Sequence, residues 1–158
     1  MNVTIICIGK LKEKFYTDAV SEYSKRIKRF ASLNIIELPD ESIPQNSSEK
    51  QNEKIKQREG ERILAKLKPS SFVVSMCIEG SAVSSEELAG TLKKAAMYPG
   101  NIVFVIGGSL GLSDEVKRRS DMRMSFGRIT LPHQLMRVVL AEQIYRAFMI
   151  NSGASYHK

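Results

Sequence analysis

The sequence predicts an α/β protein with a largely parallel sheet flanked by helices. Short runs of large apolar residues, typical of strands that are covered on both faces, alternate with segments whose apolar residues recur every three or four positions, as in helices. Glycine or proline closes most of these segments. The 158 residues suit one domain covering 1–158, because no linker or repeat divides them.

Five apolar runs are the expected strands, and each is joined to the next by a helix or a loop. The runs are Asn2–Ile8, Leu33–Leu38, Phe72–Ile78, Ile102–Ile106 and Met122–Phe126. The first helix is expected between Leu11 and Phe30, with its apolar residues on one face. Its other face carries the basic residues Lys25, Arg26, Lys28 and Arg29. This face is either solvated or, as the alternative, a contact for RNA.

Serine caps mark the starts of the next helices. Ser48 with Gln51 forms a capping box that opens a charged helix reaching about Leu67, whose first half is expected to project into solvent. Ser84 with Glu87 forms a second capping box that opens another helix, and Pro99 and Gly100 end this helix. A short helix is expected from Ser113 onward.

The last predicted helix, from about His133 to Asn151, is apolar most of the way round. One face of a small domain could not cover so many apolar residues, so a partner subunit is one way to bury them. Gly153 suits the position just after the end of this helix.

The chain carries a net charge of +7, from 24 Lys and Arg against 17 Asp and Glu. This excess favours a polyanionic partner such as nucleic acid, and the alternative is a merely basic soluble protein. No apolar run approaches the roughly 20 residues that span a bilayer, and the first apolar run is too short for a signal peptide. Cys7 and Cys77 lie within strands and are interpreted as buried side chains, without metal-site spacing. We therefore expect a cytoplasmic protein without a metal or membrane partner.

Two loops follow neighbouring strands and form the candidate site. The first is Gly107–Gly111, and the second is Gly127–His133. Ligands of open α/β sheets bind at the carboxyl ends of strands, where both loops are expected, although glycine-rich turns also occur as plain connections. A dinucleotide fingerprint is excluded because Ile106 occupies the place of its first glycine, and no P-loop or nucleophile elbow is present. What remains is a pocket that holds its ligand by main-chain amides and apolar side chains. Such a pocket suits a ligand with an adenine ring and no phosphate, a description that S-adenosylmethionine meets without being established by it.

Several longer motifs resemble one known family. They are Gly9-Lys10-Leu11-Lys12, the run from Phe104 to Ser109, the run from Leu131 to Leu140, the run from Glu142 to Ala147, and Tyr156-His157-Lys158. With them, essentially the whole chain closely resembles the SPOUT (α/β-knot) methyltransferases, and within these the ribosomal RNA large subunit methyltransferase H family. The resemblance implies methylation of N3 of a pseudouridine in 23S ribosomal RNA, on the large subunit or the assembled ribosome, by a homodimer. The rival hypotheses are a non-catalytic RNA- or ribosome-binding α/β module and a nucleotide-binding enzyme of another reaction type.

The resemblance also implies an S-adenosylmethionine pocket made by three loops that form a deep C-terminal trefoil knot. The residues expected to line this pocket are Met76, Gly107, Gly108, Phe126, Gly127, Arg128, Ile129, Thr130 and Leu131. No specific role is expected of the Arg128 side chain. The chain has no added RNA-binding domain of the kind that many SPOUT relatives carry, so the dimer surface itself is expected to hold the RNA.

Four residues are candidates for substrate contact or catalysis. His133 and His157 are the only side chains with an ordinary pKa near neutrality, and His133 either acts on the substrate or caps its helix. Arg137 either binds phosphate, which we favour, or pairs with an acid such as Glu142. The resemblance implies that Tyr156 and His157 contact the substrate, where Tyr156 could stack on a splayed base.

Overall fold

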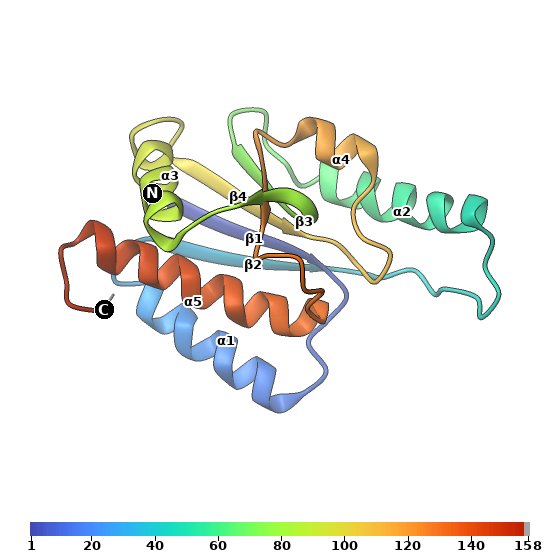
Figure 1. Ribbon diagram of the computed structural model, residues 1–158, viewed down its shortest axis with the longest axis horizontal. Helices are drawn as coiled ribbons and strands as arrows, with labels where there is room; N and C mark the ends of the chain where they lie inside the picture. Colours follow the sequence, from blue (N-terminus) through green and yellow to red (C-terminus); the bar gives the residue numbers. More distant parts are fainter. Residues whose placement is uncertain (157–158) are drawn as a thin grey trace.

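The computed structural model describes residues 1–156, which form a five-stranded sheet with helices on both faces (Figure 1). All the pairings between strands are parallel, and the strand order is β2-β1-β4-β3-β5. The strands are β1 (Asn2–Ile8), β2 (Ser32–Leu38), β3 (Phe72–Ala82), β4 (Asn101–Ile106) and β5 (Met122–Ser125). The predicted α/β class with a parallel sheet is therefore confirmed.

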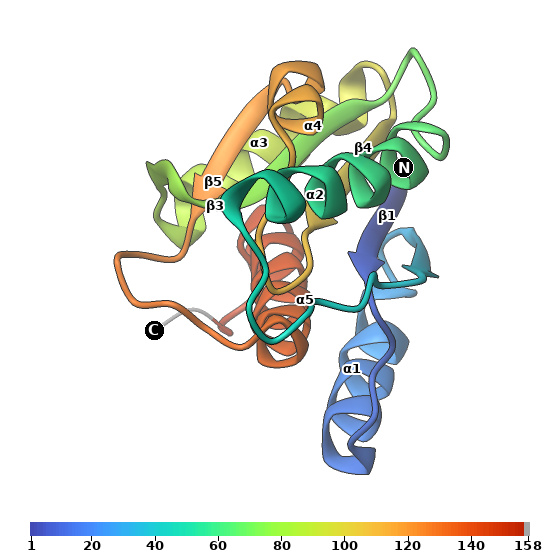
Figure 2. The same ribbon diagram turned by 90° about the vertical axis from the view of Figure 1, so that its right-hand side faces the viewer.

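The helices divide between the two faces of the sheet. They are α1 (Lys14–Ile27), α2 (Glu49–Leu64), α3 (Ser85–Met97), α4 (Asp114–Arg119) and α5 (His133–Asn151). Helices α1, α3 and α5 cover one face, with α5 in contact with both others, while α2 and α4 cover the opposite face (Figure 2). Figure 1 shows the first turns of α2 extending beyond the sheet, as the sequence predicts.

The predicted helix boundaries rest on caps that are present in the structure. Ser48 and Ser84 each accept a hydrogen bond from the backbone N–H three residues later, and both capping boxes are complete. Ser113 caps α4 in the same way through its hydroxyl. Gly153, at φ +70°, donates its backbone N–H to the Ile150 carbonyl after the end of α5.

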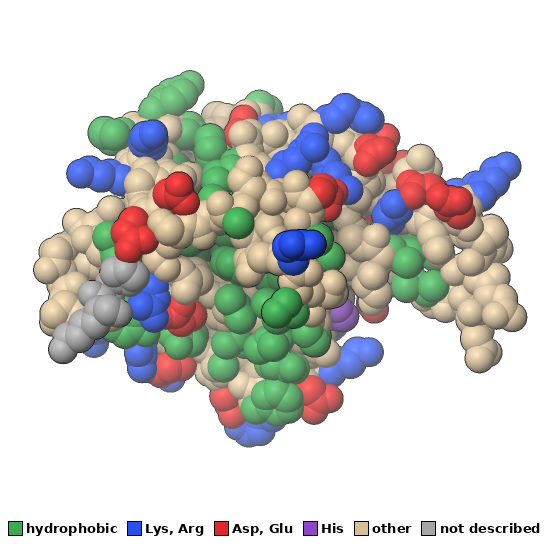
Figure 3. All heavy atoms as spheres, in the orientation of Figure 1, with side chains coloured by type: hydrophobic (Ala, Val, Ile, Leu, Met, Phe, Trp, Pro, Cys, Tyr) green, Lys and Arg blue, Asp and Glu red, His purple; other side chains and the backbone are tan. Residues whose placement is uncertain are grey.

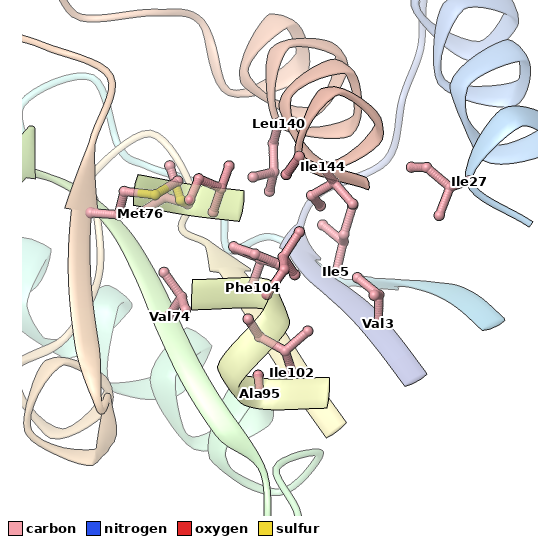
Figure 4. Packing of buried hydrophobic residues seen from close by; sticks show 14 of the residues in the cluster. Val3, Ile5, Ile27, Val74, Met76, Ala95, Ile102, Phe104, Leu140 and Ile144 are labelled. Atoms are coloured by element: carbon pink, nitrogen blue, oxygen red, sulfur yellow. The ribbon is translucent and has the colours of Figure 1, made fainter. Parts of the chain in front are cut away.

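Alternate residues of the central strands face two separate cores. Val3, Ile5 and Cys7 of β1 pack with α1, α3 and α5, whereas Ile6 and Ile8 pack toward α2 and α4. Figure 4 shows the larger core, in which side chains from β4, β3 and α5 meet between the sheet and the helices. Burying each large apolar side chain contributes about 1.5–3 kcal/mol, so these two cores fix the positions of the strand ends.

Strand β3 continues to Ala82, four residues beyond its predicted end at Ile78. Both Met76 and Ser81 pair with Met124 of β5, so the residues between them form a bulge. Gly80 lies against β5 so closely that an added Cβ would be 2.7 Å from the carbonyl carbon of Met124. The absence of a side chain at Gly80 therefore lets the strand return to the sheet after the bulge.

Two other predicted boundaries are wrong by a few residues. Helix α1 begins at Lys14, not at Leu11. Glu13 before it has an extended backbone, and the N–H groups of Leu11 and Lys12 donate to side chains of other elements. Strand β5 ends at Ser125, and Phe126 belongs to the following loop.

Candidate functional site

A cavity of about 610 Å³ opens at the carboxyl ends of β3, β4 and β5. Its size lies in the range of small-molecule sites. Most of its wall is apolar and includes the side chains of Met76, Ile106, Leu112, Met124, Leu131 and Met136. The two predicted loops both line the cavity, so the structure brings together the segments that the sequence singles out.

The loop after β4 is a tight turn in which three of the five residues are glycines. The backbone N–H of Gly111 donates to the Gly108 carbonyl at 3.0 Å, and Gly111 has φ +85°, a conformation that favours glycine. An added Cβ at Gly107 would lie 2.8 Å from the carbonyl carbon and from the oxygen of Gly111. Gly107 therefore lets the two ends of the turn touch while its backbone lines the cavity.

The loop after β5 offers main-chain groups to the cavity. The Ser125 hydroxyl donates to the Gly127 carbonyl at 2.8 Å and accepts from the Gly127 N–H at 3.1 Å, which fixes the start of the loop. Within residues 1–156, no hydrogen bond occupies the backbone of residues 128–131. Ile129 is 80% exposed, and the loop contributes Ile129, Thr130 and Leu131 to the lining. Arg128 is exposed and does not line the cavity.

The bulge of β3 makes the third wall and carries the charges nearest to the apolar surface. Lys117 of α4 forms an ion pair with Glu79 of this bulge, and both residues line the cavity. Hydrogen bonding within the pair lowers the pKa of Glu79 and raises the pKa of Lys117. Lys56, the other lysine at the cavity, is paired with Glu53. Both lysines that line the cavity therefore have a carboxylate partner, and neither presents an unpaired charge to a phosphate.

His133, the first residue of α5, also lies in the wall of the cavity. Burial lowers its pKa below the ordinary value of 6.5, and the positive charges of Arg137 and Lys12 lower it further against the opposing effect of Asp40. The imidazole is consequently neutral at pH 7 and can accept a proton. Its side chain caps nothing, because Pro132 precedes α5 without a side-chain cap.

Arg137 is buried, and it contacts neither of the two partners that the sequence suggested, a phosphate or Glu142. It is 2% exposed and donates to the Ile8 carbonyl at 2.9 Å, to the Gly9 carbonyl at 2.8 Å and to Oε1 of Glu37 at 2.8 Å. A phosphate contact is therefore wrong for this structure, since all the terminal nitrogens are used inside the protein. The ion pair with Glu142 is also wrong, because Glu142 pairs with Arg146.

Tyr156 is not in the lining of the cavity. Its ring contacts Tyr145 edge to face at 5.0 Å and lies under the Arg146 guanidinium, and its hydroxyl is 3.4 Å from Glu142. These contacts hold the tail on the side of α5. His157, the other predicted substrate contact in the tail, lies outside the described residues.

Two residues near the cavity were missed by the sequence reasoning. Cys77 was expected to be buried, but it is half-buried and lines the cavity because the bulge turns it away from the core. Glu59 of α2 is 4% exposed, its carboxylate accepts from the Glu41 N–H, and it lies behind Gly108. Burial raises the pKa of Glu59. The only signal in the sequence was a charged residue at a helical spacing from Ile55 and Ile63.

No group of three His, Cys, Asp or Glu side chains in residues 1–156 is arranged to hold a metal ion. None of the helices there is long and apolar enough to cross a membrane.

Comparison with known proteins gives full-length matches. The sequence model of one family, described as "Predicted SPOUT methyltransferase", matches residues 1–157. A protein of Lactococcus lactis subsp. cremoris, named ribosomal RNA large subunit methyltransferase H, is 57% identical over 159 aligned residues that cover 100% of both chains. A protein of the same name from Lactobacillus acidophilus is 55% identical, with the same coverage.

One solved structure is similar in fold. It is a methyltransferase of Legionella pneumophila in complex with S-adenosylmethionine, with a TM-score of 0.52 and 12% sequence identity. The match covers 93% of this chain and 66% of that one. At this identity the likeness shows the fold.

Proposed function

Because this chain belongs to the SPOUT methyltransferase family, we propose that it transfers a methyl group from S-adenosylmethionine to ribosomal RNA. The finer proposal is that the acceptor is N3 of a pseudouridine in 23S ribosomal RNA, presented by the large subunit or the assembled ribosome. Relatives of that name that align over the whole chain at 55–57% identity support it. A ribosomal substrate also implies work in the cytoplasm. The family's trefoil knot and a single domain over 1–158 are parts of the same proposal.

The cavity at the ends of β3, β4 and β5 is the observation that carries the proposal. Its apolar wall suits an adenine ring, and the unbonded backbone of residues 128–131 can hydrogen-bond to that ring or to a ribose. The nearby lysines are neutralised by Glu79 and Glu53, which agrees with a cofactor that carries no phosphate. Gly107, Gly108 and the segment 126–131 would hold it, with Met76 beside it in the apolar wall.

When bound, S-adenosylmethionine supplies a methyl group that its sulfonium sulfur has already activated. The nitrogen at N3 must lose its proton as the N–CH3 bond forms and the S–CH3 bond breaks, which leaves S-adenosylhomocysteine and a proton as the other products. The neutral imidazole of His133 lies at the cavity and can take this proton.

The proposed homodimer has support from the surface of α5. Apolar side chains on this helix remain partly exposed, among them Leu135, Val138, Val139 and Met149. Figure 3 shows hydrophobic side chains gathered on the face formed by the first half of α5 and the start of α1. Tyr156 lies outside the cavity of its own chain. In a homodimer, Tyr156 of one subunit could contact the substrate at the cavity of the other subunit.

Methyl transfer from labelled S-adenosylmethionine to ribosomes, free ribosomal RNA and tRNA, measured in parallel, tests the proposal. We expect label in 23S ribosomal RNA, and nucleoside analysis should give N3-methylpseudouridine. Binding of RNA without any affinity for S-adenosylmethionine would favour the non-catalytic RNA-binding module. Label in tRNA alone would overturn the proposed substrate.

A further inference from the structure

We propose that the turn Gly9–Lys12, which follows β1, binds the phosphate backbone of the RNA beside the cavity, and that Arg137 is the positioning residue that holds this turn. The inference rests on the proposed function, because it takes ribosomal RNA as the substrate. Figure 1 shows the segment after β1 passing the beginning of α5 on its way to α1.

The turn is held in one conformation by contacts from two other elements. Gly9, at φ +80°, donates its N–H to the Leu38 carbonyl at 2.8 Å. The Leu11 N–H donates to Glu37 of β2, and the Lys12 N–H donates to the side chain of Gln134 in α5, both at 3.0 Å. A segment with this many long-range bonds loses little conformational entropy when it binds a ligand.

Arg137 is the centre of this arrangement. Its guanidinium bridges the carbonyls of Ile8 and Gly9 and the carboxylate of Glu37, which itself receives the Leu11 N–H. The planar fork of arginine can serve several acceptors in fixed directions, whereas a lysine ammonium is a single point charge. Arg137 therefore sets the geometry of the turn without touching the RNA.

The turn presents two uncompensated positive charges. The side chains of Lys10 and Lys12 are exposed, and neither ammonium forms an ion pair within the described part of the chain. Of the nearby carboxylates, Glu37 is neutralised by Arg137, while Asp40 lies beside Gly9 and the exposed Glu13 follows Lys12 in the chain. Two free lysines on a fixed turn are suited to phosphate groups, which are spaced along an RNA strand.

The position of Lys12 connects these charges to the reaction. Its backbone N–H donates to the side chain of Gln134 at 3.0 Å, and Gln134 directly follows His133 in the cavity wall, so the turn lies beside the cavity. When a nucleobase of the RNA enters the cavity past His133, the phosphates of the RNA strand on either side of it come to lie near the turn. The lysines thereby contribute to binding of the RNA rather than to binding of the cofactor.

The test measures the affinity of a 23S ribosomal RNA hairpin for the full-length protein between about 50 and about 200 mM salt. Replacing Lys10 and Lys12 together by alanine removes two phosphate contacts and should reduce the slope of log affinity against log salt by about 1.4. Over this salt range the affinity of the wild-type protein should therefore fall about sevenfold more than that of the variant. In methyl transfer, KM for the RNA should rise, with kcat and cofactor affinity unchanged.

The matched control replaces Lys93 and Lys94, two exposed lysines of α3, and should keep the wild-type slope. Arg137→Lys retains the charge but cannot hold the turn, so it should lower the salt slope as well as the melting temperature. A purely structural role for Arg137 would lower only the melting temperature.

Three results would overturn the inference: an unchanged slope in the Lys10 and Lys12 variant, an equal loss in the control, or a loss of cofactor affinity. If the wild-type protein shows the lysine-dependent slope but transfers no methyl group, the proposed function fails while the RNA-binding turn stands.

Discussion

Replacing Gly107 by alanine should close the cofactor site while leaving the fold in place. The added Cβ would lie 2.8 Å from two backbone atoms of Gly111. Carbon atoms in contact are normally about 3.5–4.0 Å apart, so the turn has to move by roughly 1 Å. Overpacking of this kind costs about 1–3 kcal/mol, and if binding must restore the original turn, affinity falls about fivefold to 150-fold.

Isothermal titration calorimetry with S-adenosylmethionine measures this loss, and thermal unfolding reports on the fold. The matched control is Gly90→Ala in α3, where an added Cβ meets nothing within 4 Å. This variant should bind the cofactor normally and gain up to about 1 kcal/mol from the better helix propensity of alanine. Wild-type affinity in a folded Gly107→Ala protein would refute the assignment of the turn to the cofactor site.

Three further predictions concern Arg137, His133 and the cysteines. Arg137→Met leaves Glu37 and two carbonyls without their buried partner and should lower the free energy of unfolding in urea by about 3–5 kcal/mol, so a loss below about 1 kcal/mol would contradict the contacts described. Because the pKa of His133 is lowered from 6.5, the unfolded chain binds the proton first, and stability should fall as the pH decreases from 6.5 toward the folded pKa. His133→Asn should remove this part of the pH dependence in urea titrations. Iodoacetamide should modify Cys77 slowly and S-adenosylmethionine should protect it, whereas Cys7, whose pKa burial raises to about 12, should stay unmodified by mass spectrometry. Equal modification of Cys77 with and without the cofactor would place the ligand elsewhere.

The fold follows from the sequence because its strongest signals are local. Runs such as Ile102–Ile106 have no polar residue that could face solvent, which requires cover on both faces of the sheet. The capping boxes at Ser48 and Ser84 place helix starts to the residue. The bulge before Gly80 escaped prediction because it depends on how closely β5 approaches, and the sequence of β3 holds no sign of that distance.

The candidate site was only partly predictable for the same reason. Glycines after strands are visible in a sequence, so the loops at Gly107 and Gly127 could be placed at one edge of the sheet. The role of Arg137 could not be predicted, because its partners Ile8 and Glu37 lie about 100 or more positions away along the chain. An arginine in an apolar helix fits a ligand contact or a buried structural link equally well until its acceptors are known.

The most direct test of the account is a crystal structure of the protein with S-adenosylmethionine. The account predicts the adenosyl group in the cavity at the ends of β3, β4 and β5, hydrogen-bonded to the backbone of residues 107–111 and 128–131. A cofactor bound at another place, with this cavity closed by side chains of the protein, would contradict it.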